Sequence, residues 1–162
     1  MDDLEKKIME REQAGENIVR YLEFSLGTEH FAIPLPVVNE VTAMPAITPV
    51  PMTPSHFLGV INLRGQVLSI IDLRRKLNIT KREDSSEEAI IIGNVGFTNL
   101  GMTVDSINKV LPINEKLVNG TPNIESKIRK DYITGIYNIE NSLVFLLDLK
   151  KILTPEDLKK SG

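Results

Sequence analysis

The chain has 162 residues, of which 41% are hydrophobic and 25% are charged, as in one ordinary globular domain and unlike a disordered chain. It contains no cysteine and only two histidines, which excludes disulfides, thiolate metal sites, a cysteine nucleophile and a histidine-rich metal site. The net charge of −3 argues against nucleic acid as the main partner, because phosphate binding needs a concentrated basic face.

Residues 1–17 form an acidic N-terminal extension that carries the whole net charge of the chain. Leu4, Ile8 and Met9 give this segment a thin apolar stripe, so it is expected to be either helical or disordered. It lacks the basic start and the long apolar run of a signal peptide. We interpret it as a solvated appendage on a body whose charges balance.

Runs of β-branched and aromatic residues, separated by glycine, asparagine and proline, predict a mainly β chain. Tight turns are predicted at residues 27–29, 64–65 and 140–142, and each joins two strands into a hairpin. In chain order, the predicted strands are residues 21–26, 30–35, 57–63, 66–73, 89–92, 100–104, 110–113, 132–139 and 143–149.

Prolines mark the connections. Six of the nine prolines fall between residues 34 and 54, so that region is predicted to be edge, turn or loop, since proline is kept out of central strands. Residues 37–41 within it fit either a helical turn or a short strand. Residues 41–63 are uncharged over 23 positions, but four prolines rule out a lipid-exposed helix there. Residues 93–99 are predicted to be a loop.

Short helices are predicted at residues 74–77 and 151–159. In the second of these, Thr154 is a candidate cap and Pro155 fits the first helical position. The wholly polar run at residues 81–88 is predicted to be a hinge between two halves of the chain.

The two halves repeat each other. Residues 59–77 align without gaps with residues 135–153, and residues 31–41 align with residues 100–110 in the same order. Strand–turn–strand segments also resemble one another by chance, but the gapless polar matches favour a true repeat. Small antiparallel sheets must curl or close to remove their edges, so two small β-barrels packed into one body are predicted. The identical pairs include Gly59/Gly135, Asn62/Asn138, Asp72/Asp148, Asn39/Asn108 and Val41/Val110.

The search for catalytic groups is mostly negative. His30 and His56 have no serine or carboxylate at a motif spacing, so solvated or hydrogen-bonded histidines are expected. Asp72 and Asp148 occupy equivalent strand ends, where capping of the next turn is favoured over a pair of catalytic carboxylates. The glycines between residues 93 and 101 predict a turn and not a phosphate loop. We therefore expect no enzyme, no metal and no cofactor.

Glu40 and Arg64 are isolated charges in otherwise apolar segments. Their counterparts in the second half are Lys109 and Glu140, so these charges do not belong to the pattern shared by both copies. We predict that Glu40 and Arg64 mark a protein-docking face and that they can pair with each other. The alternative is two solvated surface charges.

Several motifs together resemble one known family. They are Val38-Asn-Glu-Val41, Gly59-Val-Ile-Asn-Leu-Arg-Gly65, Ile71-Asp-Leu73, Gly101-Met-Thr-Val-Asp105 with Val110-Leu111, and Tyr132-Ile-Thr-Gly135. These motifs are similar to the signature of the bacterial chemotaxis coupling proteins, the CheW family, and the resemblance covers about residues 18–154. Ser69 departs from the family, which often carries proline at that position.

The resemblance implies a mainly β fold of two SH3-like five-stranded β-barrel subdomains packed together, with short helices at the ends. It implies a non-catalytic adaptor that couples the cytoplasmic tips of methyl-accepting chemoreceptors to the regulatory domain of the histidine kinase CheA. Such a protein is a monomer alone, alternates with the kinase in rings, and is cytoplasmic, recruited to membrane receptor arrays without direct membrane insertion. A module of another chemosensory pathway, or a non-chemotaxis SH3-like binding module, stays open as an alternative.

The resemblance also implies positions for the units and for the partner contacts. The expected units are residues 1–17 (extension), 18–82 and 83–154 (first and second subdomain) and 155–162 (tail or helix). The expected partner-binding residues are Val38, Glu40, Val41, Asn62, Arg64, Gly65 and Val104. The receptor tip is expected in a groove between the barrels walled by residues near Val38, Arg64 and Val104, and residues 93–99 and 120–124 are candidates for a second-half kinase contact.

Overall fold

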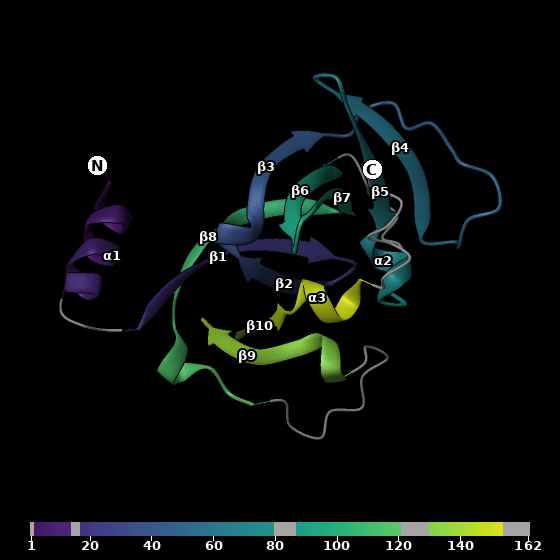
Figure 1. Ribbon diagram of the computed structural model, residues 1–162. Helices are drawn as coiled ribbons and strands as arrows, with labels where there is room; N and C mark the ends of the chain where they lie inside the picture. Colours follow the sequence, from purple (N-terminus) through teal and green to yellow (C-terminus); the bar gives the residue numbers. More distant parts are fainter. Residues whose placement is uncertain (1, 14–16, 80–86, 121–129, 154–162) are drawn as a thin grey trace.

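The computed structural model describes residues 2–13, 17–79, 87–120 and 130–153, and it is built almost wholly of strands (Figure 1). The strands are β1 (Ile18–Leu26), β2 (Glu29–Pro34), β3 (Val38–Ala43), β4 (Phe57–Leu63), β5 (Gln66–Asp72), β6 (Ala89–Val95), β7 (Thr98–Val104), β8 (Ser106–Asn114), β9 (Ile133–Ile139) and β10 (Ser142–Leu147). The α-helices are α1 (Asp3–Gln13), α2 (Leu73–Lys76) and α3 (Leu149–Ile152), and the 3-10 turns are η1 (Leu35–Val37), η2 (Glu115–Leu117) and η3 (Lys130–Tyr132).

The strands form two five-stranded sheets of the same design. Sheet A has the order β8-β1-β2-β10-β9, and sheet B has the order β3-β6-β7-β5-β4. Each sheet contains one parallel pair, β2 with β10 and β5 with β7, and its other neighbours are antiparallel. The prediction of a mainly β fold with two five-stranded units is confirmed.

Neither sheet coincides with one half of the chain. Sheet A combines β1 and β2 with β8, β9 and β10, whereas sheet B combines β3, β4 and β5 with β6 and β7. A division into subdomains at residues 18–82 and 83–154 therefore does not describe the sheets. The physical reason is that each half contributes its first hairpin to the sheet formed by the last three strands of the other half. A sequence repeat does not reveal such an exchange, because it does not say which copy a strand pairs with.

The β-hairpin turns confirm the repeat in detail. The β4–β5 turn has positive φ at Arg64 (50°) and Gly65 (84°), and the β9–β10 turn has it at Glu140 (45°) and Asn141 (68°). Two successive positive φ values define the turn type that matches the twist of paired strands. The predicted turns therefore form at equivalent positions, although only one of the four residues is glycine.

The two alignments also share a β-bulge. Asn39 is skipped in the pairing of β3 with β6, and Asn108 is skipped in the pairing of β8 with β1. The side chain of Asn39 donates a hydrogen bond to Asn99 Oδ1 at 3.0 Å, and Asn108 Nδ2 lies 3.2 Å from His30 Nδ1 at the matching place. Each asparagine thus ties the bulged edge strand to the second strand of the adjacent hairpin.

The repeated glycines allow the chain to approach the outer strand of each sheet. Thr48 forms a backbone bridge to Val60, and Asn119 forms the equivalent bridge to Ile136. A Cβ atom on Gly59 would lie 2.1 Å from the Thr48 carbonyl oxygen, and one on Gly135 would lie 2.2 Å from a methyl of Val118. Only glycine lets the connecting segments pack against β4 and β9 and shield these edges.

The largest apolar core lies between the two sheets. Phe24, Phe31 and Leu26 from sheet A and Ile71 and Met102 from sheet B are fully buried there. Two smaller apolar clusters belong to single sheets, one around Ala32 and Val144 in sheet A and one around Ile70 and Ile90 in sheet B. The packing of the sheets against each other therefore buries more side chains than either sheet encloses alone.

Several predicted boundaries are corrected. Residues 93–99 are not a loop, because β6 and β7 extend until only Gly96 and Phe97 form the turn. Residues 110–113 belong to a longer strand, β8, and Pro112 is tolerated there because β8 is an edge strand. Residues 37–41 contain both alternatives, since η1 ends at Val37 and β3 begins at Val38.

The helices and connections give further outcomes. The helix predicted at residues 74–77 is confirmed as α2, whereas α3 begins at Leu149, two residues earlier than predicted. The predicted cap Thr154, the predicted first helical residue Pro155 and most of the predicted hinge lie outside the described residues. Within the extension, α1 is helical, lies to one side of the sheets (Figure 1) and buries Ile8.

Candidate functional site

The predicted pair of isolated charges forms in the structure. Glu40 lies on β3, Arg64 lies in the β4–β5 turn, and the Arg64 guanidinium forms a hydrogen-bonded ion pair with the Glu40 carboxylate. Because β3 and β4 are the two outer strands of sheet B, the pair links opposite edges of that sheet. The hydrogen bond and the negative charge of Glu40 raise the pKa of Arg64. Both side chains remain accessible, so the pair is available at the surface.

The turn that presents Arg64 is fixed by its neighbours. Asn62 Oδ1 accepts a hydrogen bond from the Gly65 backbone N–H at 3.0 Å, and Gly65 has the positive φ of 84° that glycine adopts without strain. Asn62 and Gly65 therefore shape this surface by holding the turn, and Arg64 supplies its charge.

The predicted valines occupy different environments. Val38 packs against the main core while remaining partly accessible, and Val41 is 42% exposed on β3. Val104, at the end of β7, is only 1% exposed and belongs to the main core. A side chain so deeply buried offers no contact surface, so Val104 is not itself the partner-binding residue that was expected. Val104 is the last residue of β7, and its side chain faces the main core.

A hollow beside the Arg64 turn extends this surface. It is lined by residues of the β4–β5 and β6–β7 turns, including Gly65, Val67 and Phe97. Phe97 is fully exposed and Val67 is 55% exposed, so apolar groups flank the charged pair. We call Glu40, Arg64, Gly65, Val67 and Phe97 the barrel-end surface.

Phe97 belongs to residues 93–99, which are candidates for a second-half kinase contact. The structure places it on sheet B, beside Gly65 and Val67 of the first half. The strand exchange brings it there. A sequence signal for its exposure exists, because Phe97 follows Gly96 in the glycine-containing segment that is predicted to be a turn. Residues 121–124 of the other predicted contact lie outside the described residues.

A second, more apolar groove, about 370 Å³ in volume, lies between the two sheets. The expected walls are residues near Val38, Arg64 and Val104; Val37, beside Val38, lines the groove, whereas those three residues themselves do not. The groove is lined by Tyr21, Pro34, Val37, Asn94, Val95, Thr134, Leu147, Asp148, Leu149 and Lys150. Burial and the negative charge of Glu115 raise the pKa of Tyr21 at this groove.

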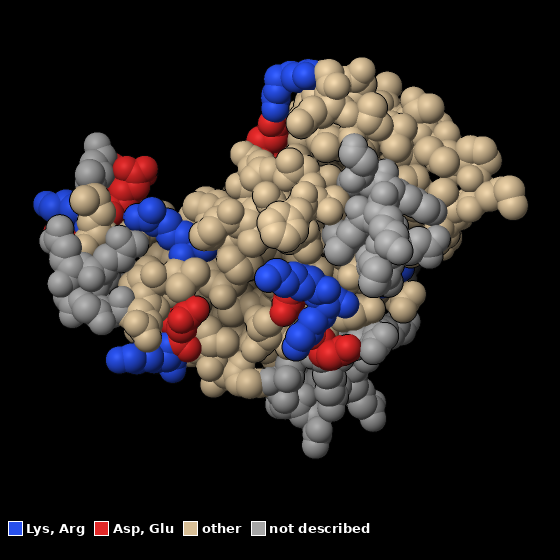
Figure 2. Space-filling model, viewed as in Figure 1, with Lys and Arg blue, Asp and Glu red and all other residues tan. Residues whose placement is uncertain are grey.

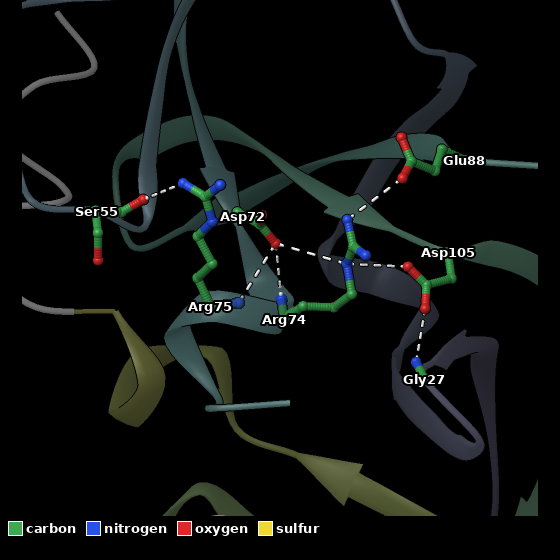
Figure 3. Close-up of polar contacts among 7 residues, drawn as sticks. All are labelled: Gly27, Ser55, Asp72, Arg74, Arg75, Glu88 and Asp105. Carbon is green, nitrogen blue, oxygen red and sulfur yellow. Dashed lines mark hydrogen bonds and ion pairs between the residues drawn. The ribbon is translucent and has the colours of Figure 1, made fainter. Parts of the chain in front are cut away.

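A buried polar cluster joins the sheets elsewhere (Figure 3). The Arg74 guanidinium lies 3.0 Å from Asp105 Oδ1 and 3.3 Å from Glu88 Oε1. The second oxygen of Asp105 accepts a hydrogen bond from the Gly27 N–H at 2.6 Å, in the β1–β2 turn. Arg74 follows a strand of sheet B and Gly27 belongs to a hairpin of sheet A, so this network connects one sheet to the other. We call Arg74, Asp105, Glu88 and Gly27 the Arg74 cluster.

The strand-end acids have the predicted capping role. Asp72 Oδ1 accepts hydrogen bonds from the backbone N–H groups of Arg74 and Arg75, and Asp148 Oδ1 accepts one from Lys150. In the described part of the chain, no three metal-binding side chains of the His, Cys, Asp or Glu type come together.

Charges on the accessible surface are mixed. On the face shown in Figure 2, basic and acidic side chains lie next to each other between wide uncharged areas. No helix in the described ranges is long and apolar enough to cross a membrane.

Comparison with known proteins identifies the family. The family model of the CheW-like domain matches residues 20–157. The chain belongs to the CheW family. CheW proteins are chemotaxis coupling and scaffolding proteins without a catalytic role, which confirms the resemblance carried by the motifs of both halves.

Individual relatives agree with this assignment. The chain is 31% identical to a chemotaxis protein CheW of Bacillus subtilis over 137 residues, which are 85% of this chain and 88% of that protein. It is 30% identical to CheW of Klebsiella aerogenes over 146 residues, 90% and 88% of the two chains. The crystal structure of the scaffolding protein TtCheW from Thermoanaerobacter tengcongensis superimposes with a TM-score of 0.79 at 28% identity, covering 86% of this chain and 90% of that one. These similarities extend over nearly all of the two-sheet body.

Proposed function

We propose that this CheW-family chain is the adaptor that couples the cytoplasmic tips of methyl-accepting chemoreceptors to the regulatory domain of the histidine kinase CheA. The observation that carries the proposal is the family match over residues 20–157, which includes both sheets and the two surfaces described above. The adaptor holds its partners together and leaves the phosphoryl chemistry to the kinase.

The groove between the sheets suits the receptor tip. Its apolar lining, with Val37, Val95 and Leu147, offers contacts to the apolar face of an amphipathic helix. Helix-in-groove binding uses such apolar anchors spaced along one helix face. We assign the receptor to this groove on that basis.

The barrel-end surface suits the kinase regulatory domain. Phe97 and Val67 provide exposed apolar area, and the Glu40–Arg64 pair lies at its side. An apolar centre beside a polar, charged border is the usual composition of a protein interface. Val38 and Val41 on β3 extend this contact, and Asn62 keeps its turn in shape.

The adaptor works in the cytoplasm and joins receptor arrays at the membrane through its partners. We expect the isolated chain to be a monomer with modest affinity at each face. In an array, rings of adaptor and kinase multiply weak contacts by on the order of 10² or more when the geometry permits simultaneous binding. Modest single affinities therefore suffice.

The proposal is tested by reconstitution. Purified chain, kinase and membrane-bound or clustered receptor fragments are mixed, and co-sedimentation and kinase autophosphorylation are measured. We expect autophosphorylation to rise only when all three components are present. Equal kinase activity with and without the chain would overturn the proposal, and so would tight nucleic-acid binding at physiological salt in place of receptor binding.

A further inference from the structure

The internal repeat makes the two ends of the sheet–sheet interface equivalent. The β1–β2 hairpin turns at Gly27 (φ 61°) and the β6–β7 hairpin turns at Gly96 (φ 65°), each between the matching last and first strand residues. Asp72 and Asp148 cap the matching helices α2 and α3. Each end therefore combines one hairpin turn with one strand–helix junction from the other sheet.

The alignment assigns counterparts to the Arg74 cluster. Arg74 corresponds to Lys150, two residues after the capping aspartate in each copy. Asp105 corresponds to Pro36, because the pairings of β3 with β6 and of β8 with β1 keep the same register on either side of the bulge. The second end thus retains a cation but lacks the carboxylate.

At the first end, which contains Gly27 and Arg74, the Asp105 carboxylate fills the space between the cation and the hairpin turn. Arg74 is 6% exposed and Asp105 is 4% exposed. One oxygen of Asp105 lies 3.0 Å from Arg74 Nε, and the other accepts the Gly27 N–H at 2.6 Å (Figure 3). A carboxylate of the protein itself occupies the space between a cation and a hairpin turn.

At the second end, which contains Gly96 and Lys150, no carboxylate stands at the position that corresponds to Asp105. Lys150 and Gly96 are exposed, as is Pro36. The groove of about 370 Å³ lies here, lined by Lys150 together with Asn94 and Val95 of the turn region. The groove is thus the unfilled counterpart of the Arg74 cluster.

We propose that Lys150 determines the specificity of the groove by pairing with one acidic side chain on the docked helix. This inference rests on the proposed function, since it concerns the helical partner assigned to the groove. The partner's carboxylate takes the place that Asp105 fills at the first end, beside the Lys150 ammonium group and the Gly96 turn. The apolar lining supplies affinity, and the charge pair fixes which face and register of the helix enters.

The nearby Asp148 adds a fixed negative charge to the site. Its Oδ1 is held by the Lys150 backbone N–H at 3.0 Å, beside the single groove-lining lysine. This charge disfavours a strongly acidic partner segment, and the apolar lining favours a helix whose acid lies among apolar residues.

A charge swap tests this pairing. The probe is a soluble chemoreceptor tip fragment that binds the wild-type chain, together with fragments in which each acidic residue is changed singly to lysine. The matched control is Lys151→Glu, which makes the same charge change at the next residue of α3 but does not line the groove. Thermal unfolding checks that both variants fold.

We expect Lys150→Glu to weaken binding of the wild-type fragment about tenfold and Lys151→Glu to weaken it less than about twofold. One of the lysine-bearing fragments should restore binding to Lys150→Glu. Equal weakening by both variants, or no fragment that restores binding, would overturn the pairing while leaving the proposed function in place. Failure of every tip fragment to bind the wild-type chain would instead overturn the proposed function.

Discussion

Arg74 Nε lies 3.0 Å from Asp105 Oδ1, and both residues are almost completely buried between the two sheets. Removing one partner of a buried ion pair leaves the other charge unpaired in a poorly solvated site. We therefore expect Arg74→Met to lower the free energy of unfolding by about 3 to 5 kcal/mol, as measured by urea denaturation.

Arg75 is the matched control for this change. It is the next residue on α2, it also contacts Asp72, and its side chain is 58% exposed. Arg75→Met should cost less than about 1 kcal/mol, because an accessible ion pair is worth little. Similar losses for the two variants would show that burial of Arg74 does not matter to its contribution.

Gly59 should not tolerate a side chain. An added Cβ would lie 2.1 Å from the backbone oxygen of Thr48, and the φ of 144° disfavours other residues. Gly59→Ala should lower the free energy of unfolding by about 2 kcal/mol or more, because both backbone strain and displacement of the Thr48 bridge contribute.

Gly120→Ala is the corresponding control, since an added Cβ there meets nothing within 4 Å. Its unfolding midpoint should remain close to that of the wild-type chain. If Gly59→Ala were equally mild, the bridge between Thr48 and Val60 would contribute little to the closure of sheet B.

The cap of α3 can be tested through Asp148, whose side chain accepts the Lys150 N–H. Asp148→Ala should reduce stability by about 1 kcal/mol, as measured by thermal or urea unfolding. Asp148→Asn keeps an accepting oxygen and should recover most of that loss. No difference between the two variants would mean that the helix end does not depend on this hydrogen bond.

The Glu40–Arg64 pair should matter for binding and not for folding. Reversing either charge places like charges together on the barrel-end surface, so binding of the kinase regulatory domain should weaken on the order of tenfold in a titration. The midpoint of thermal unfolding should change little, since the Arg64 side chain is 70% exposed.

Lys109→Glu provides the matched reversal at the equivalent position of sheet A, away from the barrel-end surface. It should leave kinase binding unchanged. A large loss of stability in Glu40→Lys or Arg64→Glu would instead identify a structural ion pair.

The raised pKa of Tyr21 predicts that the free energy of unfolding depends on pH in the alkaline range. Burial and Glu115 raise its pKa in the folded protein above 10.0, the ordinary value. The unfolded chain therefore loses this proton first, so the stabilisation is complete below about pH 10 and is lost as the pH rises through the folded pKa. Tyr21→Phe should flatten the decline of the free energy of unfolding above pH 10, as measured by urea denaturation at several pH values. Parallel declines in the two proteins would contradict this prediction.

Local chemistry was readable from the sequence. The hairpin turn at Arg64 and Gly65 and the capping role of Asp72 follow from residue types whose preferences act over a few positions. The charge pair of Glu40 and Arg64 was predicted for a related reason, because isolated charges in apolar strands need water or a partner.

Long-range pairing was not readable in the same way. The burial of Val104 depends on how the two sheets face each other, and the position of Phe97 beside Gly65 depends on the exchange of hairpins. Each half is compatible with pairing within itself or with the other half, because the repeated strands have the same pattern. The sequence shows that Pro36 stands in place of Asp105 at the equivalent end, but it does not show that a groove lies there.

The first hairpin of each half completes the sheet of the other half, and the largest apolar core lies between the two sheets. Melting one sheet would expose the apolar face of the other to water, so the body should come apart in a single cooperative step. Severing the backbone between Ile79 and Glu87 should leave two interlocked fragments that still behave as one particle. The same exchange points to an ancestral dimer of two identical short chains. Each chain would have contributed its first hairpin to the sheet of the other before the two genes were fused.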